Sequence, residues 1–420
     1  MTDINIDREI TNVDENKITD SLSKLETYQK ELQKTLREGT YRADNSSINL
    51  PYDTELEKEV KQVGEKYGCD VLIVIGIGGS NLGTKAVHEA IQTKLHNHIA
   101  TETQVYFADT THPPTLRSIK KIITKSHSDG KRVIFNTISK SGGTTETIAN
   151  FEYLLEAMRK NEQWRDDVII TTSKGSNFSK YADNESIETL YIPRKVGGRF
   201  SVLSTVGLLP LEIMGVNITE LCRGARDAVK YSLKKNNNIL RSAAVKHAYI
   251  GKGSHNIFLF DPDLESLGKW HRQLVGESLG KDGKGVNPTV SIGSTDLHSV
   301  AQYYLGGCRN EYHEFVEVKE YDSDSLPAHE EFENLVKDIQ GKELSKIVSS
   351  ISQGVKESFK QEDIPFSTNR LERVDEYNLG WWMQYKMIEI MLVGYLLGIN
   401  TFNQPQVELY KEETRKELQK

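Results

Sequence analysis

The run VLIVIGIGGSNLGTKAV, from Val71 to Val87, decides the fold class of this chain. Its apolar start predicts a buried strand, the glycines predict a tight turn, and the remainder predicts the start of a helix. RVIFNTISKSGGTTETIANF, from Arg132 to Phe151, repeats this plan, and DVIITTSKGS, from Asp167, adds a strand that ends in small polar residues. Strands separated by helical stretches indicate right-handed crossovers and a mainly parallel sheet. The sequence therefore predicts an α/β fold.

The same plan begins again in the second half of the chain. The polar run KKNNN, residues 234–238, breaks the pattern, and HNIFLF (255–260) and VNPTVSIGSTDLHSVAQYYLGG (286–307) then start a second round. We therefore expect two similar α/β halves that meet near residue 236.

Helices are expected at both ends of the chain. Ile18, Leu22, Leu25, Leu32 and Leu36 recur at helical spacings, which predicts an amphipathic helix over 18–36. The stretch LGWWMQYKMIEIMLVGYLLGIN, residues 379–400, predicts a mostly buried helix, and a proline at 405 is expected to open a charged C-terminal helix.

The composition excludes several classes of function. The 420 residues carry a formal net charge of −7 with no basic tail, so nucleic acid is not an expected partner. With 37% hydrophobic and 27% charged residues, the chain is typical of a soluble globular protein. The longest apolar stretch, Met387 to Ile399, contains Glu389 and is too short to cross a bilayer, so no membrane partner is expected.

The N-terminal segment and the cysteines point to the cytoplasm. MTDINIDREITNVDEN is acidic and has no apolar region, so it is not expected to be a secretory signal. Cys69, Cys222 and Cys308 form no C-x-x-C pair, and the histidines form no H-E-x-x-H motif. Neither a disulfide framework nor a metal site is therefore expected.

The turn GIGGSNLG, residues 76–83, is the first place where a ligand could bind. Its glycines allow close backbone approach, and Ser80 can donate to an anion near a helix N-terminus. Asn81 stands at the third glycine of the dinucleotide fingerprint, and Thr84-Lys85 reverses the order that a P-loop requires. This turn is therefore either an anion-binding turn or a purely structural one.

The turn SKSGGTTET, residues 139–147, is more specific. Ser139, Ser141, Thr144 and Thr145 concentrate hydroxyl groups where a strand ends and a helix begins, and Lys140 adds a charge. A phosphate monoester needs several such donors, whereas a helix N-cap needs only one. We therefore predict phosphate binding here, with an N-cap cluster as the alternative.

The turn KVGGRFS, residues 195–201, places Arg199 beside adjacent glycines. This arginine either pairs with a structural carboxylate or faces a developing anion in a cleft, and the residues alone leave both readings open.

Six segments together resemble the glucose-6-phosphate isomerase family, in its compact bacterial form. They are IGIGGSNLG, SKSGGTTET, VGGRFSVLSTVG, QLVGESLGK, GSTDLHSVAQ and GINTFNQPQVELYK, in this order over about Val71 to Lys411. The resemblance implies two sugar-isomerase α/β sandwich domains with mainly parallel sheets, at 51–235 and 236–400. It also implies an N-terminal helical extension at 1–50 and a C-terminal helical tail at 401–420 that contributes to the active site.

The resemblance implies an enzyme that interconverts glucose 6-phosphate and fructose 6-phosphate through an enediolate, without cofactor or metal. Glu277 matches the family's base, Arg199 the residue that stabilises the intermediate, and His298 and Lys411 the ring-opening pair. The family's phosphate and sugar contacts match Gly79, Ser80, Ser139, Lys140, Ser141, Thr144, Gly198, Gln273 and Gln404. It also implies a homodimer in which His298 enters the partner's site.

Other interpretations of these residues remain. Without the resemblance, Glu277 would be a solvated helix residue and His298 a capping or core histidine. A non-catalytic sugar-phosphate sensor would need the hydroxyl turn but not Glu277, His298 and Lys411 together. A nicotinamide oxidoreductase would use Asp109, which ends the strand-like run VYFAD, but the dinucleotide fingerprint is broken. The chain differs from the family pattern at Arg194-Lys195, and after Glu277 it reads Ser-Leu-Gly-Lys where the family has Ser-Asn-Gly-Lys.

Overall fold

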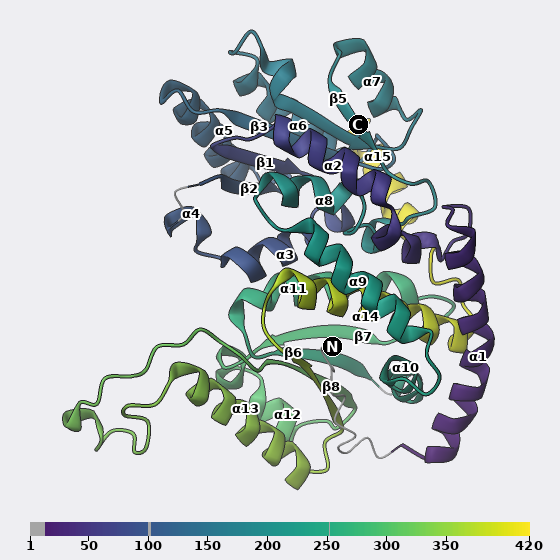
Figure 1. The fold of residues 1–420 in the computed structure, drawn as a ribbon, viewed down its shortest axis with the longest axis vertical. Helices are drawn as coiled ribbons and strands as arrows, with labels where there is room; N and C mark the ends of the chain where they lie inside the picture. Colours follow the sequence, from purple (N-terminus) through teal and green to yellow (C-terminus); the bar gives the residue numbers. More distant parts are fainter. Residues whose placement is uncertain (1–12, 100–101, 252) are drawn as a thin grey trace.

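The computed structural model describes residues 13–99, 102–251 and 253–420, which form two parallel sheets and the helices around them (Figure 1). Residues 1–12, which hold most of the segment expected not to be a secretory signal, lie outside the described residues. The strands are β1 Val71–Ile75, β2 Gln104–Ala108, β3 Val133–Ser139, β4 Val168–Thr172, β5 Glu188–Tyr191, β6 Ser254–Leu259, β7 Asn287–Ile292, β8 Glu311–Val318 and β9 Phe366–Leu371.

The helices follow the strands in the alternating order that the sequence predicts. Their bounds are α1 Glu15–Glu38, α2 Thr54–Lys66, α3 Leu82–Gln92, α4 His96–Ile99, α5 Pro113–Ser128, α6 Thr145–Met158, α7 Asn177–Glu185, α8 Thr205–Ile213, α9 Ile218–Ser232, α10 Asn238–Tyr249, α11 Glu265–Leu279, α12 Ala301–Gly306, α13 Leu344–Gln361, α14 Glu376–Leu397 and α15 Val407–Leu418. The last helix starts two residues after the proline at 405 that was expected to open it.

Both sheets are parallel throughout. The first has the order β2-β1-β3-β4-β5 and the second the order β7-β6-β8-β9, and each neighbouring pair runs in the same direction. The predicted α/β class is thereby confirmed. The polar run 234–238 lies between α9 and the start of α10, and the domain boundaries remain predictions.

The side chains of the strands alternate between two cores. In β1, Val71, Ile73 and Ile75 pack toward α5 and α6, whereas Leu72 and Val74 join a large core that reaches the second sheet. On the far side of the second sheet, phenylalanines of β6, β8 and β9 pack against α13. Helices α3, α8, α9, α11 and α14 lie between the sheets (Figure 1). One continuous apolar layer therefore joins the two halves.

Helix α14 is the centre of that layer. Every residue from Asn378 to Gly394 is buried, and the helix packs most extensively on α9. Asp375 caps its start by accepting from the Asn378 N–H at 2.7 Å, and Gly398 ends it in the left-handed region at φ 66°. The buried helix predicted over 379–400 is present, but it begins at Glu376 and ends at Leu397. None of the helices in the described residues is long and apolar enough to cross a membrane.

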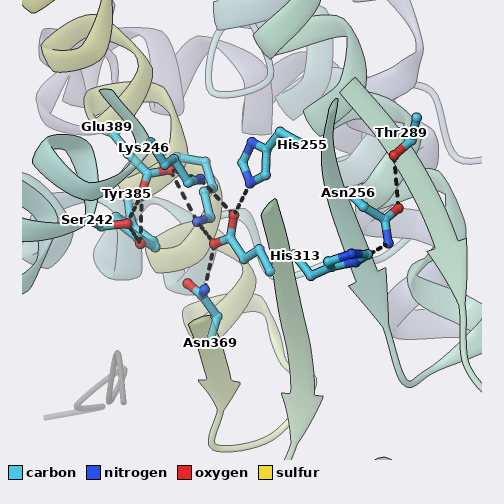
Figure 2. Close-up of polar contacts among 11 residues, drawn as sticks. Ser242, Lys246, His255, Asn256, Thr289, His313, Asn369, Tyr385 and Glu389 are labelled. Carbon is cyan, nitrogen blue, oxygen red and sulfur yellow. Dashed lines mark hydrogen bonds and ion pairs between the residues drawn. The ribbon is translucent and has the colours of Figure 1, made fainter. Parts of the chain in front are cut away.

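A buried cluster of charges fixes α14 against α10 and β8 (Figure 2). Lys246 Nζ lies 2.7 Å from Glu314 Oε2 and 2.5 Å from Glu389 Oε2, and Lys386 contacts both carboxylates. Burial alone would raise the pKa of Glu314, but Lys246 and Lys386 hold it well below its usual value. Ser242, His255, Asn369 and Tyr385 complete the contacts of the two carboxylates. The cluster is thus a neutral set of two cations and two anions.

The two carboxylates of this cluster, with one neighbouring histidine, form the one group of side chains in the described residues that has metal-ligand spacing. The group is His271, Glu314 and Glu389. The ammonium groups of Lys246 and Lys386 already neutralise both carboxylates. The arrangement is therefore that of an ion-pair network.

Candidate active site

A cavity of about 860 Å³ lies where the strands of the first sheet end. In a parallel sheet, this edge gathers the turns that precede the helices. Helix α11 and the C-terminal segment close its other side. The cavity is lined by Ile77, Gly78, Gly79, Ser80, Lys140, Ser141, Thr144, Glu146, Ser173, Lys174, Gly175, Ser176, Ile192, Arg194, Gly198, Gln273, Glu277, Gln404, Val407, Tyr410 and Lys411.

The turn after β1 touches the turn that carries Arg199. A Cβ atom on Gly79 would lie 2.2 Å from the carbonyl carbon of Gly198 and 2.7 Å from the Arg199 nitrogen. Gly78 has a φ of 57°, which glycine adopts readily. The two backbones can meet only because position 79 has no side chain, and Ser80 follows on the cavity wall.

The hydroxyl groups of the turn after β3 converge on Thr144. Its Oγ1 lies 3.1 Å from Ser139 Oγ and 3.5 Å from Ser141 Oγ. Thr144 occupies the N-cap position of α6, yet its side chain makes no capping hydrogen bond. The alternative reading as an N-cap cluster therefore does not explain the hydroxyls. Ser141 and Thr144 line the cavity, whereas Ser139 is buried beneath them.

Lys140 is held in place by the neighbouring turn. Its Nζ donates to the Val196 carbonyl at 2.7 Å. Burial lowers the pKa of Lys140, and the charges of Lys195 and Arg199 lower it further. Lys140 lines the cavity, and the cations around it would favour the binding of an anion there.

Arg199 is buried behind the cavity wall. Its Nε donates to Ser278 Oγ at 2.8 Å, and its NH1 donates to Glu277 Oε2 at 3.1 Å and also to Gln404 Oε1. Its NH2 donates to the carbonyls of Thr401 and Asn403 at 2.6 and 3.2 Å. Arg199 thus does pair with a carboxylate, but that carboxylate itself lines the cavity. Burial lowers the pKa of Arg199, against the effect of Glu277.

Glu277 and Gln273 lie one turn apart on the same face of α11. Gln273 Nε2 donates to Glu277 Oε1 at 2.9 Å, so both carboxylate oxygens have a donor. The Glu277 side chain is 28% exposed and faces the cavity. Glu277 is therefore a fixed, accessible carboxylate rather than a freely solvated helix residue.

The structure places Lys411 and His298 differently. Lys411, on α15, lines the same cavity as Glu277, with its Nζ 2.8 Å from Glu408 Oε1. His298 ends the turn Thr295–His298 after β7 of the second sheet and is exposed. It is not among the residues that line this cavity. Within one described chain, His298 and Glu277 thus do not share a site.

Sequence reasoning missed part of the lining. Ser173, Lys174, Gly175 and Ser176 follow β4, and Arg194 follows β5. The only signal was that the strand from Asp167 ends in small polar residues, which is common in structural turns as well. Because Thr172 Oγ1 donates to the Ser139 carbonyl at 2.6 Å, the turn after β4 lies beside the hydroxyl turn.

Comparisons with known proteins agree with this geometry. The model of the phosphoglucose isomerase family matches residues 60–316. The glucose-6-phosphate isomerase of Enterococcus faecalis is 34% identical over 412 residues, covering 93% of this chain and 91% of that protein. A hypothetical protein of Thermus thermophilus has a crystal structure with a TM-score of 0.86 at 28% identity, covering 96% and 97% of the two chains. A glucose-6-phosphate isomerase from Chlamydia trachomatis, at 20% identity and a TM-score of 0.73, covers 89% of this chain and 74% of its own and shows the shared fold.

Proposed function

Because this chain belongs to the phosphoglucose isomerase family, we propose that the cavity at the end of the first sheet is where its reaction takes place. The chain is an isomerase that interconverts glucose 6-phosphate and fructose 6-phosphate, a step of glycolysis and gluconeogenesis. The observation that supports the site best is the carboxylate of Glu277, held between Arg199 and Gln273 at the cavity wall.

Glu277 is the proposed base. Aldose and ketose differ by one proton moved between carbons 2 and 1, so a single carboxylate can remove the proton from one carbon and return it to the other. The two donors fix the carboxylate without covering it. This arrangement suits proton transfer to and from a bound sugar.

Arg199 is proposed to stabilise the enediolate from behind the wall. Its NH1 binds both Glu277 and Gln404, which line the cavity. An arginine stays protonated at any working pH, and its charge acts strongly where water is excluded. When Glu277 takes the proton and becomes neutral, the negative charge passes to the sugar, still close to this guanidinium. No metal or redox cofactor is needed for this step.

The hydroxyl turn is the proposed phosphate site. Ser141, Thr144 and Lys140 line the cavity next to the first turn of α6, whose N-cap side chain makes no hydrogen bond to it. Backbone N–H groups and the dipole at a helix N-terminus favour a phosphate. Ser139 would support this turn from beneath. Gly79, Ser80 and Gly198 would complete the residues that contact the substrate's phosphate and sugar. Gln273 and Gln404 would contact the sugar.

Thr144→Ala is expected to weaken substrate binding by about 10- to 150-fold, since a hydrogen bond to a charged group contributes ~1.5 to 3 kcal/mol. The measurement is KM for fructose 6-phosphate, together with the Ki of inorganic phosphate as a competitor. Thr145→Ala is the matched control, because Thr145 is the next residue but does not line this cavity. Equal KM values for both variants and the wild type, or no competition by phosphate, would exclude the turn from phosphate binding.

The ring-opening step is proposed to need two chains. Lys411 and Glu277 line one cavity, whereas His298 is exposed outside it. A homodimer that brings His298 into the partner's cavity would complete the acid and base needed to open the sugar ring. The segment between β8 and α13 projects from the body (Figure 1) and exposes Phe332, Leu335 and Val336 by 51, 74 and 53%. Such an apolar surface supports contact with a second copy.

Mixing two inactive variants tests the shared site. Glu277→Gln chains are refolded with His298→Ala chains, and activity is expected to return. One site in each mixed dimer then combines an intact Glu277 with the partner's intact His298. A tag on one variant shows that mixed dimers have formed. If tagged mixed dimers remain inactive, both residues serve sites within a single chain and the shared arrangement is wrong.

A coupled assay that follows fructose 6-phosphate formation from glucose 6-phosphate tests the activity against the two alternative functions, a sensor and an oxidoreductase. The isomerase step is run without nicotinamide, so product formation distinguishes the protein from an oxidoreductase, and turnover distinguishes it from a sensor.

We also propose a cytoplasmic location, because the reaction is a step of glycolysis. From the two sheets we propose sugar-isomerase domains at 51–235 and 236–400, with helical extensions at 1–50 and 401–420.

A further inference from the structure

Three cations bind backbone carbonyls at the end of α14 and in the linker that follows it, residues 398–406. Lys284 Nζ donates to the carbonyl of Leu397 at 2.7 Å, at the end of α14. Lys281 Nζ donates to the carbonyl of Asn400 at 2.5 Å. Arg199 takes the carbonyls of Thr401 and Asn403, as described above. Four backbone carbonyls between Leu397 and Asn403 are thus bound by these side chains, and the last three belong to the linker.

Two of these cations connect the linker to the helix that carries Glu277. Lys281 Nζ also donates to the Ser278 carbonyl at 3.2 Å, and Arg199 Nε donates to the Ser278 hydroxyl. Ser278 follows Glu277 and lies in the last turn of α11, where helix carbonyls have no partner within the helix. Lys281 and Arg199 therefore form two parallel bridges from Ser278 to the linker.

The position of α15 depends on this linker. None of the residues from Val407 to Leu418 is buried, so packing fixes α15 weakly. Leu409 and Tyr410 are 64 and 55% exposed. The linker, in contrast, is anchored by the cations and by Phe402, whose ring packs 5.6 Å from that of Phe200. Lys411 thus reaches the cavity on a helix whose placement is set at its start.

We infer that Lys281 is a positioning residue: it fixes the linker against α11, so that Gln404 and Lys411 stand correctly opposite Glu277. The inference rests on the roles proposed above for Gln404 and Lys411. Lys281 is itself only 6% exposed and does not line the cavity, so it does not touch the sugar. Burial, with Arg199 nearby, lowers the pKa of Lys281 to about 8, against the effect of Glu277.

Lys281→Met tests the inference, because methionine keeps an unbranched side chain of similar volume, one atom shorter, and removes both bonds. Phe402 and Arg199 still hold the linker, so the variant is expected to fold. A shift of about 1 Å at reacting groups can lower a rate ~10²-fold, so we expect kcat to fall between about 10- and 100-fold. The Ki of inorganic phosphate is expected to stay within about twofold, because the hydroxyl turn lies on other elements.

Lys284→Met is the matched control. This variant also removes a hydrogen bond from a lysine to a backbone carbonyl. Lys284 is exposed, so a water molecule can replace its ammonium group. Leu397 belongs to α14, which is fixed by its own packing. Its kcat is expected to remain within about twofold of the wild type. Lys281→Arg, which keeps the charge and the donors, is expected to recover part of the kcat lost by Lys281→Met.

Each result decides the question. A wild-type kcat in Lys281→Met overturns the inference. A loss of kcat in Lys284→Met as large as that in Lys281→Met also overturns it. So does a Ki of inorganic phosphate that rises in Lys281→Met as much as kcat falls. Lys281→Gln, which is too short to reach Asn400, replaces Lys281→Met if that variant does not fold. Failure of both to fold shows a purely structural residue. Full activity of Lys411→Met or Glu277→Gln would instead contradict the proposed catalytic roles, whatever Lys281 does.

Discussion

Glu277→Gln is expected to lower kcat by about 10² to 10⁴, the usual cost of losing a general base. The amide cannot accept the proton, but the site can keep its shape. Gln273 Oε1 is buried without a hydrogen-bond partner. If the Gln273 amide turns over, this oxygen can accept from the new amide at 277, while the amide oxygen still accepts from Arg199. The variant should therefore bind phosphate almost as the wild type does.

Steady-state kinetics in both directions and the Ki of inorganic phosphate measure the two parts of this result. Glu265→Gln is a suitable control, because it makes the same change in the first turn of α11, outside the cavity. Its kcat should stay within about twofold of the wild type. If Glu277→Gln retains more than about a tenth of the wild-type turnover, another group is the base.

Glu314→Gln is expected to cost ~3 to 5 kcal/mol in the free energy of unfolding, because it leaves a buried ammonium group without its counter-charge. Lys246 and Lys386 would then share only Glu389. Urea unfolding followed by tryptophan fluorescence measures the change, since Trp382 lies close to Lys386. The kinetic constants of the folded enzyme should change little, because no member of the cluster lines the cavity.

The double variant Glu314→Leu with Lys386→Met provides the control. It removes one anion and one cation together and leaves the pair of Lys246 and Glu389, 2.5 Å apart, balanced. Replacing a buried ion pair by apolar side chains is often neutral, so this variant should be more stable than Glu314→Gln alone. If the double variant is less stable, charge balance is not what the cluster provides.

The repeated strand, turn and helix plan was predictable because it is local. Period and glycine position reveal β1 and β3 within a short window, and the apolar run reveals α14. The hydroxyl turn was found for the same reason. The turn after β4 was not predicted to line the cavity, because Ser173 and Ser176 carry no signal that separates a ligand contact from an ordinary turn.

The long-range contacts could not be predicted from the residues alone. The sequence left Arg199 open between a structural pair and an anion-facing group, and the structure shows that its carboxylate partner is Glu277, 78 positions away. The cluster around Glu314 draws on α10, β8 and α14, so no window of sequence contains it. The placement of Lys281 follows from the path of a linker more than a hundred residues later. Such contacts depend on tertiary packing, which local periodicity does not report.

The central position of α14 has a consequence for how the protein is made. Its buried surface is shared with α9, α10 and α11, which all precede it in the chain and are synthesised earlier. Until residues 376–397 have left the ribosome, those three helices expose the apolar faces that α14 will cover, and a nascent chain in this condition attracts chaperones or aggregates. All nine strands of the described residues precede α14 in the chain, so both sheets can form before it, but the apolar layer between them is complete only once α14 has packed onto these helices.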